Sequence, residues 1–415
     1  MVVNRKSIAT TAPGADAFTF SDGNGALVNF GNLSAAGGLA DGIRVTAAGA
    51  SVVNHGSIVT SGDGSDGIGA GGWFGALDGV SVTNFGTIAS SGNATGTDDA
   101  PEYPTGIELF GENERITNHG TITSRGIDGS GVSLVGSHGE VRNYGTIDAE
   151  AIGIVLDSLT GEDHANSIEN FGLIRTHDLG LAHGIWVFTD GNDIVNRGTI
   201  RAEGVHDFGI ALEGMNNHSA NYGVIAAAGE EARGVLITNE GNDFTNYGRI
   251  EASGADGIGV RFSFDDGLSL TGSLFTNRGT VDASGGGYAI LGSIPDEQVV
   301  NRGTLNGDVD MGDGNDRFVA GSGGHLNGLL TLGDGNDRIT IERHGGDLVI
   351  GDFAASGASQ DVLDLSAFHL RSFADVMSHA SQTGGDVILT LAGDTHVTLQ
   401  GVGLTALNPA DFITG

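Results

Sequence analysis

The sequence of 415 residues contains no cysteine, only 5 prolines and, at Lys6, a single lysine. The lack of cysteine excludes disulfides, which a secreted protein stabilised by metal ions does not need. With 18 basic and 52 acidic residues, the net charge is −34, which disfavours nucleic acid and anionic lipid as partners. The scarcity of lysine also disfavours enzyme classes that depend on a deprotonated lysine.

Long apolar runs are absent as well. No apolar stretch reaches the roughly 18 residues that a transmembrane helix needs, so we expect no membrane span. The N-terminal segment lacks the basic region and the continuous apolar region of a secretory signal peptide. We therefore expect any export signal to lie elsewhere in the chain.

Glycine, with 74 residues, is abundant, and part of it belongs to a repeat. The pattern Asn-x-Gly-x-(Ile/Leu/Val) recurs at a spacing of most often 25 residues, with a degraded copy at Asn4. It starts at Asn29, Asn54, Asn84, Asn118, Asn143, Asn170, Asn196, Asn221, Asn246, Asn277 and Asn301. A fixed period of this length is typical of a solenoid, in which each repeat forms one coil.

Within each repeat the apolar residues alternate with polar ones, which predicts strands rather than helices. A second apolar strand opens with glycine, as at Gly42-Ile43 and Gly184-Ile185. One coil cannot bury its apolar face alone, so coils must stack. We predict an all-β parallel β-helix of about 12 coils, with a length on the order of 55 Å at ~4.8 Å per coil.

Stacked coils place equivalent residues in columns. The recurrent Asn is expected to point inward and form a ladder of amides; the alternative is that it binds a ligand. We expect the Gly two residues later to permit a tight corner or a positive φ.

Two outward columns have open interpretations. After each Asn comes a flat side chain, from Phe30, His55 and Phe85 onward, and such side chains either stack on one another or bind sugar rings. The stripe Val155, Trp186, Ala211 and Leu236 is either covered by a loop or is an interaction surface.

Longer repeats contain insertions, at 71–79, around 98–104 and around 264–272. Loops on a rigid scaffold often carry function. The first two insertions belong to consecutive coils and supply acidic and aromatic side chains. Together with Trp186, they give these candidate saccharide- or cation-binding residues: Trp73, Phe74, Asp98, Asp99, Glu102 and Tyr103. The simpler interpretation is that they are solvated loop residues.

From Gly307 the composition changes, and two similar heptads, Gly-Asp-Gly-Asn-Asp-Arg-apolar, begin at Gly312 and Gly333. Tight glycine turns expose carbonyl oxygens and the Asp residues supply charge, a donor set that suits Ca²⁺. The predicted calcium-binding residues are Gly312, Asp313, Gly314, Asn315, Asp316, Gly333, Asp334, Gly335, Asn336 and Asp337. The alternative is an ordinary Gly/Asp turn.

These heptads resemble the nonapeptide repeats of RTX proteins, although Met311 and Leu332 replace the first glycine. By this resemblance Asp316 and Asp337 are the carboxylate ligands, and the glycines donate carbonyl oxygens. The segment after the heptads resembles the C-terminal target domain of type I secretion substrates, including serralysin-type proteases. That resemblance implies export by a type I secretion apparatus and an extracellular location. The zinc signature His-Glu-x-x-His is absent.

We therefore expect three parts: a β-solenoid over 1–306 similar to adhesin and autotransporter repeats, a calcium-binding β-roll over 307–345, and a small β-rich secretion and capping domain over 346–415. The predicted function is a secreted, calcium-binding adhesin, matrix or carbohydrate-binding scaffold without a catalytic residue.

The alternative is a polysaccharide lyase, hydrolase or epimerase, because calcium-tailed β-helices also resemble alginate epimerases and pectate-lyase-like enzymes. The Asp-Pro-His-Asp motif of the epimerases is absent. Candidate residues for a lyase, such as Arg175, His177 and His183, show no diagnostic spacing.

Overall fold

The computed structural model describes residues 1–72, 75–97, 100–158, 161, 164–177, 182–263 and 271–415. The chain divides into two compact units, Met1–His218 with Gly223–Gly229 and Ser219–Tyr222 with Glu230–Gly415. The predicted boundaries at 306 and 345 therefore fall inside the second unit. No helix among the described residues is long and apolar enough to cross a membrane.

The first unit consists of coils that each contribute one strand to each of three parallel sheets. In its first sheet the neighbours are β1 (Val2–Asn4), β4 (Ala26–Asn29), β7 (Ser51–Asn54), β10 (Ser81–Asn84), β15 (Arg115–Asn118), β18 (Glu140–Asn143), β21 (Ser167–Asn170) and β24 (Asp193–Asn196). In its second sheet they are β2 (Ile8–Thr10), β5 (Asn32–Ala35), β8 (Ser57–Thr60), β11 (Thr87–Ser90), β16 (Thr121–Ser124), β19 (Thr146–Ala149), β22 (Leu173–Thr176), β25 (Thr199–Glu203) and β28 (Val224–Ala228).

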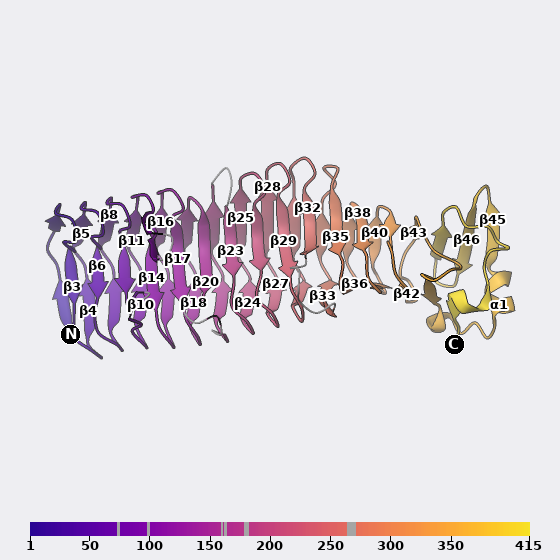
Figure 1. Ribbon diagram of the computed structural model, residues 1–415, viewed down its shortest axis with the longest axis horizontal. Coiled ribbons are helices and arrows are strands. Elements are labelled where there is room, and N and C mark those ends of the chain that lie inside the picture. The colour runs from indigo at the N-terminus through magenta and orange to yellow at the C-terminus, as the bar shows by residue number, and fades with distance from the viewer. Residues whose placement is uncertain (73–74, 98–99, 159–160, 162–163, 178–181, 264–270) are drawn as a thin grey trace. The chain divides into compact units, whose positions relative to one another are not determined.

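The third sheet of this unit carries the site described below. Its strands are β3 (Phe18–Phe20), β6 (Ile43–Val45), β9 (Ile68–Ala70), β14 (Ile107–Phe110), β17 (Ser130–Val135), β20 (Ile152–Asp157), β23 (His183–Val187) and β26 (Phe208–Leu212). Successive members lie side by side, as β14, β17 and β20 do in Figure 1. The insertion before β14 contains an antiparallel pair, β12 (Thr95–Thr97) and β13 (Ala100–Glu102).

The second unit repeats this plan, and β27 (His218–Asn221) lies in sequence at the boundary between the units. Its first sheet contains β30 (Asp243–Asn246), β33 (Thr271–Asn277), β36 (Asp296–Asn301), β39 (Arg317–Ala320), β42 (Arg338–Ile341), β44 (Val362–Asp364) and β48 (Phe412–Ile413). Its second sheet contains β31 (Arg249–Ala252), β34 (Thr280–Asp282), β37 (Thr304–Asn306) and β40 (His325–Asn327).

Its third sheet contains β29 (Arg233–Thr238), β32 (Ile258–Ser263), β35 (Tyr288–Ser293), β38 (Asp308–Gly312), β41 (Leu330–Thr331) and β43 (Leu348–Ile350). The antiparallel strands β45 (Ala380–Thr383), β46 (Asp386–Leu391) and β47 (Thr395–Leu399) follow, with β47 parallel to β43. The helical elements are α1 (Phe373–Ser378) and the 3₁₀ turns η1 (Ser366–Phe368) and η2 (Pro409–Asp411). The prediction of a parallel β-helix is thus confirmed.

Two kinds of inward column hold the coils together. The apolar column of the first sheet includes Leu27, Val52 and Ile116, each at most 1% exposed. Burial of each aliphatic side chain stabilises the fold by about 1.5–3 kcal/mol. This row continues in register from coil to coil, as Val82 does between Val52 and Ile116.

The predicted asparagine ladder is present. In the first unit each amide donates to the next one, from Asn4 through Asn196, over 2.7–2.9 Å. In the second unit the ladder runs from Asn221 to Asn301 over 2.9–3.0 Å. Asn143 also donates to the carbonyl oxygen of Leu173, 3.2 Å away. The amides are saturated by one another and by backbone, which supports the structural interpretation over ligand binding.

Of the two reasons expected for the glycine after each Asn, the positive φ is wrong, whereas the tight corner is present, as at Gly145 in the bend between β18 and β19. None of these glycines has a positive φ; the backbone of the neighbouring coil lies too close for a side chain. A Cβ added at Gly145 would lie 2.1 Å from the carbonyl oxygen of Gly120. Close approach of coils therefore requires this glycine.

Candidate functional site

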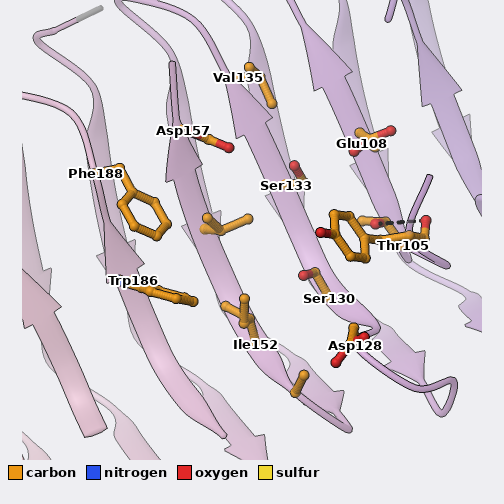
Figure 2. A pocket seen from close by; sticks show the side chains of 13 residues that line it. Thr105, Glu108, Asp128, Ser130, Ser133, Val135, Ile152, Asp157, Trp186 and Phe188 are labelled. Carbon is orange, nitrogen blue, oxygen red and sulfur yellow. Dashed lines mark hydrogen bonds between the residues drawn. The ribbon is translucent and has the colours of Figure 1, made fainter. Parts of the chain in front are cut away.

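A cleft of about 420 Å³ opens on the outer face of the third sheet of the first unit. It spans β14, β17, β20 and β23, four successive coils (Figure 2). It is lined by Tyr103, Thr105, Glu108, Asp128, Ser130, Ser133, Val135, Ala151, Ile152, Val155, Asp157, Trp186 and Phe188. Acidic and aromatic side chains thus share one concave surface.

The strand register places four of these residues in one row across the floor. Glu108 is the partner of Ser133, Ser133 of Val155, and Val155 of Trp186. Asp157 follows Val155 by two residues and therefore lies on the same face, paired with Val135. Because side chains alternate along a strand, the residues between these outward positions point into the core and hold the strands in place.

Aromatic rings form one end of the cleft. Trp186 lies next to Phe188 (Figure 2), and their ring centroids are 4.3 Å apart. The buried His183 meets Trp186 edge-on at 4.4 Å, which fixes the indole from below. Burial lowers the pKa of His183 to about 4, so this ring is neutral at pH 7. The indole Nε1 finds no hydrogen-bond acceptor among the described residues.

Tyr103 belongs to the insertion before β14 and is 40% exposed. The pKa of its hydroxyl is raised, first by burial and then by the negative charges of Asp128 and Asp157. The electrostatic field of these two carboxylates therefore reaches the Tyr103 hydroxyl. The Thr105 hydroxyl donates to the Tyr103 carbonyl oxygen, 3.4 Å away, which ties the insertion to the sheet.

Two hydroxyl groups lie on the floor between these ends. Ser130 and Ser133 are only 5% and 6% exposed, and Figure 2 shows both among the side chains lining the cleft. Neither hydroxyl makes a hydrogen bond within the described part of the chain. They can donate to or accept from a ligand.

A buried acidic residue lies behind the cleft. The buried Asp66 accepts from the backbone N–H of Thr105 at 3.1 Å. Its pKa is raised well above the usual value, first by burial and then by the charges of Glu108 and Asp41. Asp41 in turn forms an ion pair with Arg44 at 2.7 Å. Arg44 does not line the cleft, and no Arg, Lys or His does in the part of the chain that the structure describes.

Of the residues predicted as ligand-binding, Tyr103 and Trp186 meet at this cleft. Glu102 lies in β13, and its side chain is not among the described ones. Trp73, Phe74, Asp98 and Asp99 lie outside the described residues.

Sequence reasoning missed Glu108, Asp128, Asp157, Phe188 and the two serines. The available signal was positional, since Glu108 and Asp157 occupy outward positions of the third sheet, which also supplies Val155 and Trp186. The rest of the predicted stripe is buried, with Ala211 at 0% in the first unit and Leu236 at 7% in the second.

The predicted column of flat side chains is confirmed within each unit. Rings from Phe30 to Phe171 stack with centroids 4.8–4.9 Å apart and planes within 8°. Tyr222 and Tyr247 stack in the same way at 4.7 Å in the second unit. Their faces are occupied by one another and only edges are exposed. This column is therefore a poor platform for sugar rings, which need a ring face.

The heptads place their last Asp residues in the interior. Asp316 and Asp337 are at most 2% exposed, and each accepts a backbone N–H from the coil before it, that of Glu297 and that of Asp316, at 2.7 Å. Asp361 continues this carboxylate ladder by accepting from Asp337 at 3.1 Å. Gly312, Gly314 and Gly333 have positive φ values of 89°, 126° and 87°.

The remaining heptad residues lie at the surface. Asp313, Asn315, Asp334 and Asn336 are exposed. Asn315 and Asn336 line a shallow cavity of about 520 Å³ next to Arg317 and Arg338. Gly335 lies in the turn between Asp334 and Asn336. Next to it, the carbonyl oxygen of Asp334 accepts a hydrogen bond from the Gly314 N–H at 2.9 Å.

The carboxylate ladder has the donor chemistry that suits a hard cation. One oxygen of Glu297, one of Asp316 and one of Asp337 is buried without a hydrogen-bond partner among the described residues. Burial raises the pKa of all three, and neighbouring carboxylates raise the pKa of Asp316 and Asp337 further. In the part of the chain that the structure describes, no three acidic or His side chains converge as a metal site.

The polar residues considered for a lyase do not gather. His177 lies at the end of β22 with its Nε2 2.6 Å from Asp148, whereas His183 points inward from the third sheet. The structure therefore gives no arrangement of these residues that suits proton abstraction.

Comparison with known proteins agrees with this fold. A family model described as the BigA third pectate lyase-like domain matches residues 4–217, a stretch that contains the whole cleft. No curated protein and no solved structure matches the chain. The match covers more than half of the chain, which accordingly belongs to the family of BigA third pectate lyase-like domains.

Proposed function

We propose that this protein is a non-catalytic, extracellular β-helix that binds saccharide in the cleft of its first unit. The observation that carries the proposal is the meeting of Tyr103, Trp186 and Phe188 with carboxylates and two buried hydroxyls on one concave surface. Apolar sugar faces pack on aromatic rings, while carboxylates and hydroxyls accept and donate hydrogen bonds to sugar hydroxyls. A role as adhesin or matrix protein follows from such binding.

The described lining supplies no side-chain cation for a lyase that acts on uronic-acid polymers. Proton abstraction next to a carboxylate needs a cation that neutralises it, together with a base. The described lining offers acidic residues and no cationic side chain. Binding without reaction therefore fits these residues better than elimination.

Tryptophan fluorescence tests saccharide binding directly, because the chain has only 2 tryptophans, Trp73 and Trp186. The variant Trp73→Phe leaves Trp186 as the sole reporter. Titration with a panel of oligosaccharides should shift its emission for at least one class. Trp186→Ala should weaken saccharide binding about tenfold, and calorimetry measures this loss.

The matched control is Tyr144→Ala, an exposed aromatic residue of the stacked column in the same unit. It should leave affinity unchanged. Equal losses in both variants, or no emission change with any saccharide, would overturn the assignment of the cleft.

A glycoside hydrolase is the second candidate, because Glu108, Asp128 and Asp157 share the cleft. Two carboxylates flanking the scissile bond are the usual requirement for this reaction. Release of reducing ends from a bound polysaccharide, abolished by Asp157→Asn and by Glu108→Gln, would establish hydrolysis and remove the non-catalytic assignment.

We also propose that the heptad segment binds Ca²⁺ and that the chain is exported by a type I secretion apparatus. The support for calcium is the set of buried carboxylate oxygens on Glu297, Asp316 and Asp337 that lack partners. Bound Ca²⁺ would neutralise these carboxylates, and binding energy would then become folding energy.

Millimolar Ca²⁺ should raise the thermal stability of the full chain, and a chelator should reverse the gain. Asp316→Asn should remove most of this response, whereas Asp313→Asn, at an exposed position, is the comparison. A stability that is indifferent to Ca²⁺ would contradict the calcium proposal. Retention of the full chain in cells that have an intact type I apparatus would contradict the export proposal.

A further inference from the structure

We infer that the cleft selects saccharides with free amino groups, such as glucosamine polymers, over neutral and uronic-acid saccharides. This inference rests on the proposed saccharide-binding function and specifies its ligand class. It is carried by the charge of the lining, the ring faces at one end and the buried hydroxyls of the floor.

The charge of the lining is of one sign. Glu108 lies in the floor row opposite Ser133, Asp157 follows Val155 on the next coil, and Asp128 precedes β17. The buried Asp66 behind Thr105 adds little to this field, because burial raises its pKa and disfavours its charged form. A uronate would bring its own carboxylate into this field and be repelled, whereas an ammonium group would be attracted.

The aromatic end favours the same ligand. A cation over the face of Trp, or of Phe or Tyr, is attracted by the negative ring face. Trp186 and Phe188 lie together at 4.3 Å, and carboxylates lie on neighbouring strands of the same cleft. An amino sugar can therefore pack its apolar face on the indole and direct its ammonium group to a carboxylate.

The floor offers two hydroxyl groups to a ligand with donors and acceptors. Ser130 and Ser133 are more than nine-tenths buried and their hydroxyls face the cleft without a hydrogen bond in the described part of the chain. Hydroxyl groups that face a cleft without a protein partner are available to water or to a ligand. Sugar hydroxyl or amino groups would satisfy both serines.

The test compares three tetrasaccharides on the full chain with Trp73→Phe: glucosamine with free amines, its N-acetylated form, and galacturonate. Trp186 emission and calorimetry are read at about pH 5.5, where amines are protonated and exposed carboxylates ionised. The free amine should bind about tenfold tighter than the N-acetylated form, and galacturonate should not bind. Raising salt from about 0.05 to 0.3 M should weaken the free amine alone.

Two variants distinguish the effect of the carboxylates in the cleft from the effect of the negative charge of the whole protein. Asp157→Asn should weaken binding of the free amine about threefold or more beyond any loss for the N-acetylated form. Glu112→Gln, at an exposed acid outside the cleft in the same unit, should change neither affinity. Circular dichroism checks that each variant retains its β-structure.

The outcomes separate this inference from the function on which it rests. Equal affinity for the free-amine and N-acetylated forms would overturn the amino-sugar inference and keep the saccharide cleft. Absence of binding by all three and by the wider panel would overturn both. Binding of a lysine-rich peptide that depends on Asp157, with no binding of glucosamine, would show a cationic protein ligand and would also overturn the inference.

Discussion

Replacement of Glu114 by Gln tests how a buried carboxyl group makes the stability of this fold depend on pH. Glu114 precedes β15, is 0% exposed, and has both carboxylate oxygens without a geometric hydrogen-bond partner among the described residues. Later coils of the same unit carry an amide at this register position. There Asn166 accepts from the Gly139 N–H at 2.7 Å, and Asn192 accepts from the Asn166 N–H at 2.8 Å.

Burial raises the pKa of Glu114 from 4.5 to about 8, although the nearby backbone N–H groups of Val80 and Gly79 lower it. The folded state thus holds the proton more tightly than the unfolded state. Its contribution to stability is complete below pH 4.5 and is lost as pH rises through 8. At 1.36 kcal/mol per pKa unit, the loss approaches about 5 kcal/mol above pH 8 and is about 3 kcal/mol at pH 7.

Glu114→Gln should remove this dependence. The difference in unfolding free energy between variant and wild type should move by about 3–5 kcal/mol in favour of the variant between pH 5 and pH 9. Other buried carboxylates titrate in both proteins and cancel in this difference. Because repeat proteins open locally, amide hydrogen exchange in β10 and β15 is the suitable assay.

Glu112→Gln is the control, since Glu112 is exposed two residues away. Its stability difference from wild type should stay flat across the same pH range. Parallel pH profiles for wild type and Glu114→Gln would refute the argument that burial keeps this carboxyl protonated.

Further predictions concern the columns. Asn143→Ala should cost about 2 kcal/mol or more, because it leaves buried amide partners unsatisfied; denaturant unfolding measures this, and a neutral result would contradict a structural ladder. Gly145→Ala should destabilise strongly because its Cβ would lie 2.1 Å from a carbonyl oxygen. By contrast, Gly75→Ala meets no atom within 4 Å and should stay within about 0.5 kcal/mol of wild type, so similar melting temperatures for the two would count against the close-approach argument. Tyr144→Ala should cost about 1 kcal/mol in thermal unfolding through lost stacking, and no loss would show that the column does not stabilise the fold.

The periodic features of this fold could be predicted from the sequence. Because each coil repeats the same inward Asn and the same apolar positions, a count of residues suffices to place the asparagine ladder and the column from Phe30 to Phe171. The glycine after each Asn was predicted as a position, but its reason required the distance between coils. A sequence pattern does not contain that distance.

The cleft could not be predicted as a whole because its residues differ from coil to coil. Glu108, Ser133, Val155 and Trp186 occupy one register position, yet they share no residue type. Tyr103 was singled out in an insertion and Trp186 in an outward apolar stripe, without any indication that they meet. Only the strand register brings them to one surface.

The carboxylate ladder was found in part for a similar reason. Asp316 and Asp337 belong to repeated heptads and were visible in the sequence. Glu297 and Asp361 belong to the same column, but the steps between neighbours are 19, 21 and 24 residues. Such uneven steps conceal a column until backbone pairing is known.

The most direct test of a saccharide-binding cleft is a crystal structure of the chain with a bound glucosamine tetrasaccharide. We predict electron density for a sugar ring over the Trp186 indole, with polar contacts to Asp157 and to the serine hydroxyls of the floor. A well-defined sugar bound elsewhere, with this cleft holding only solvent, would contradict the account.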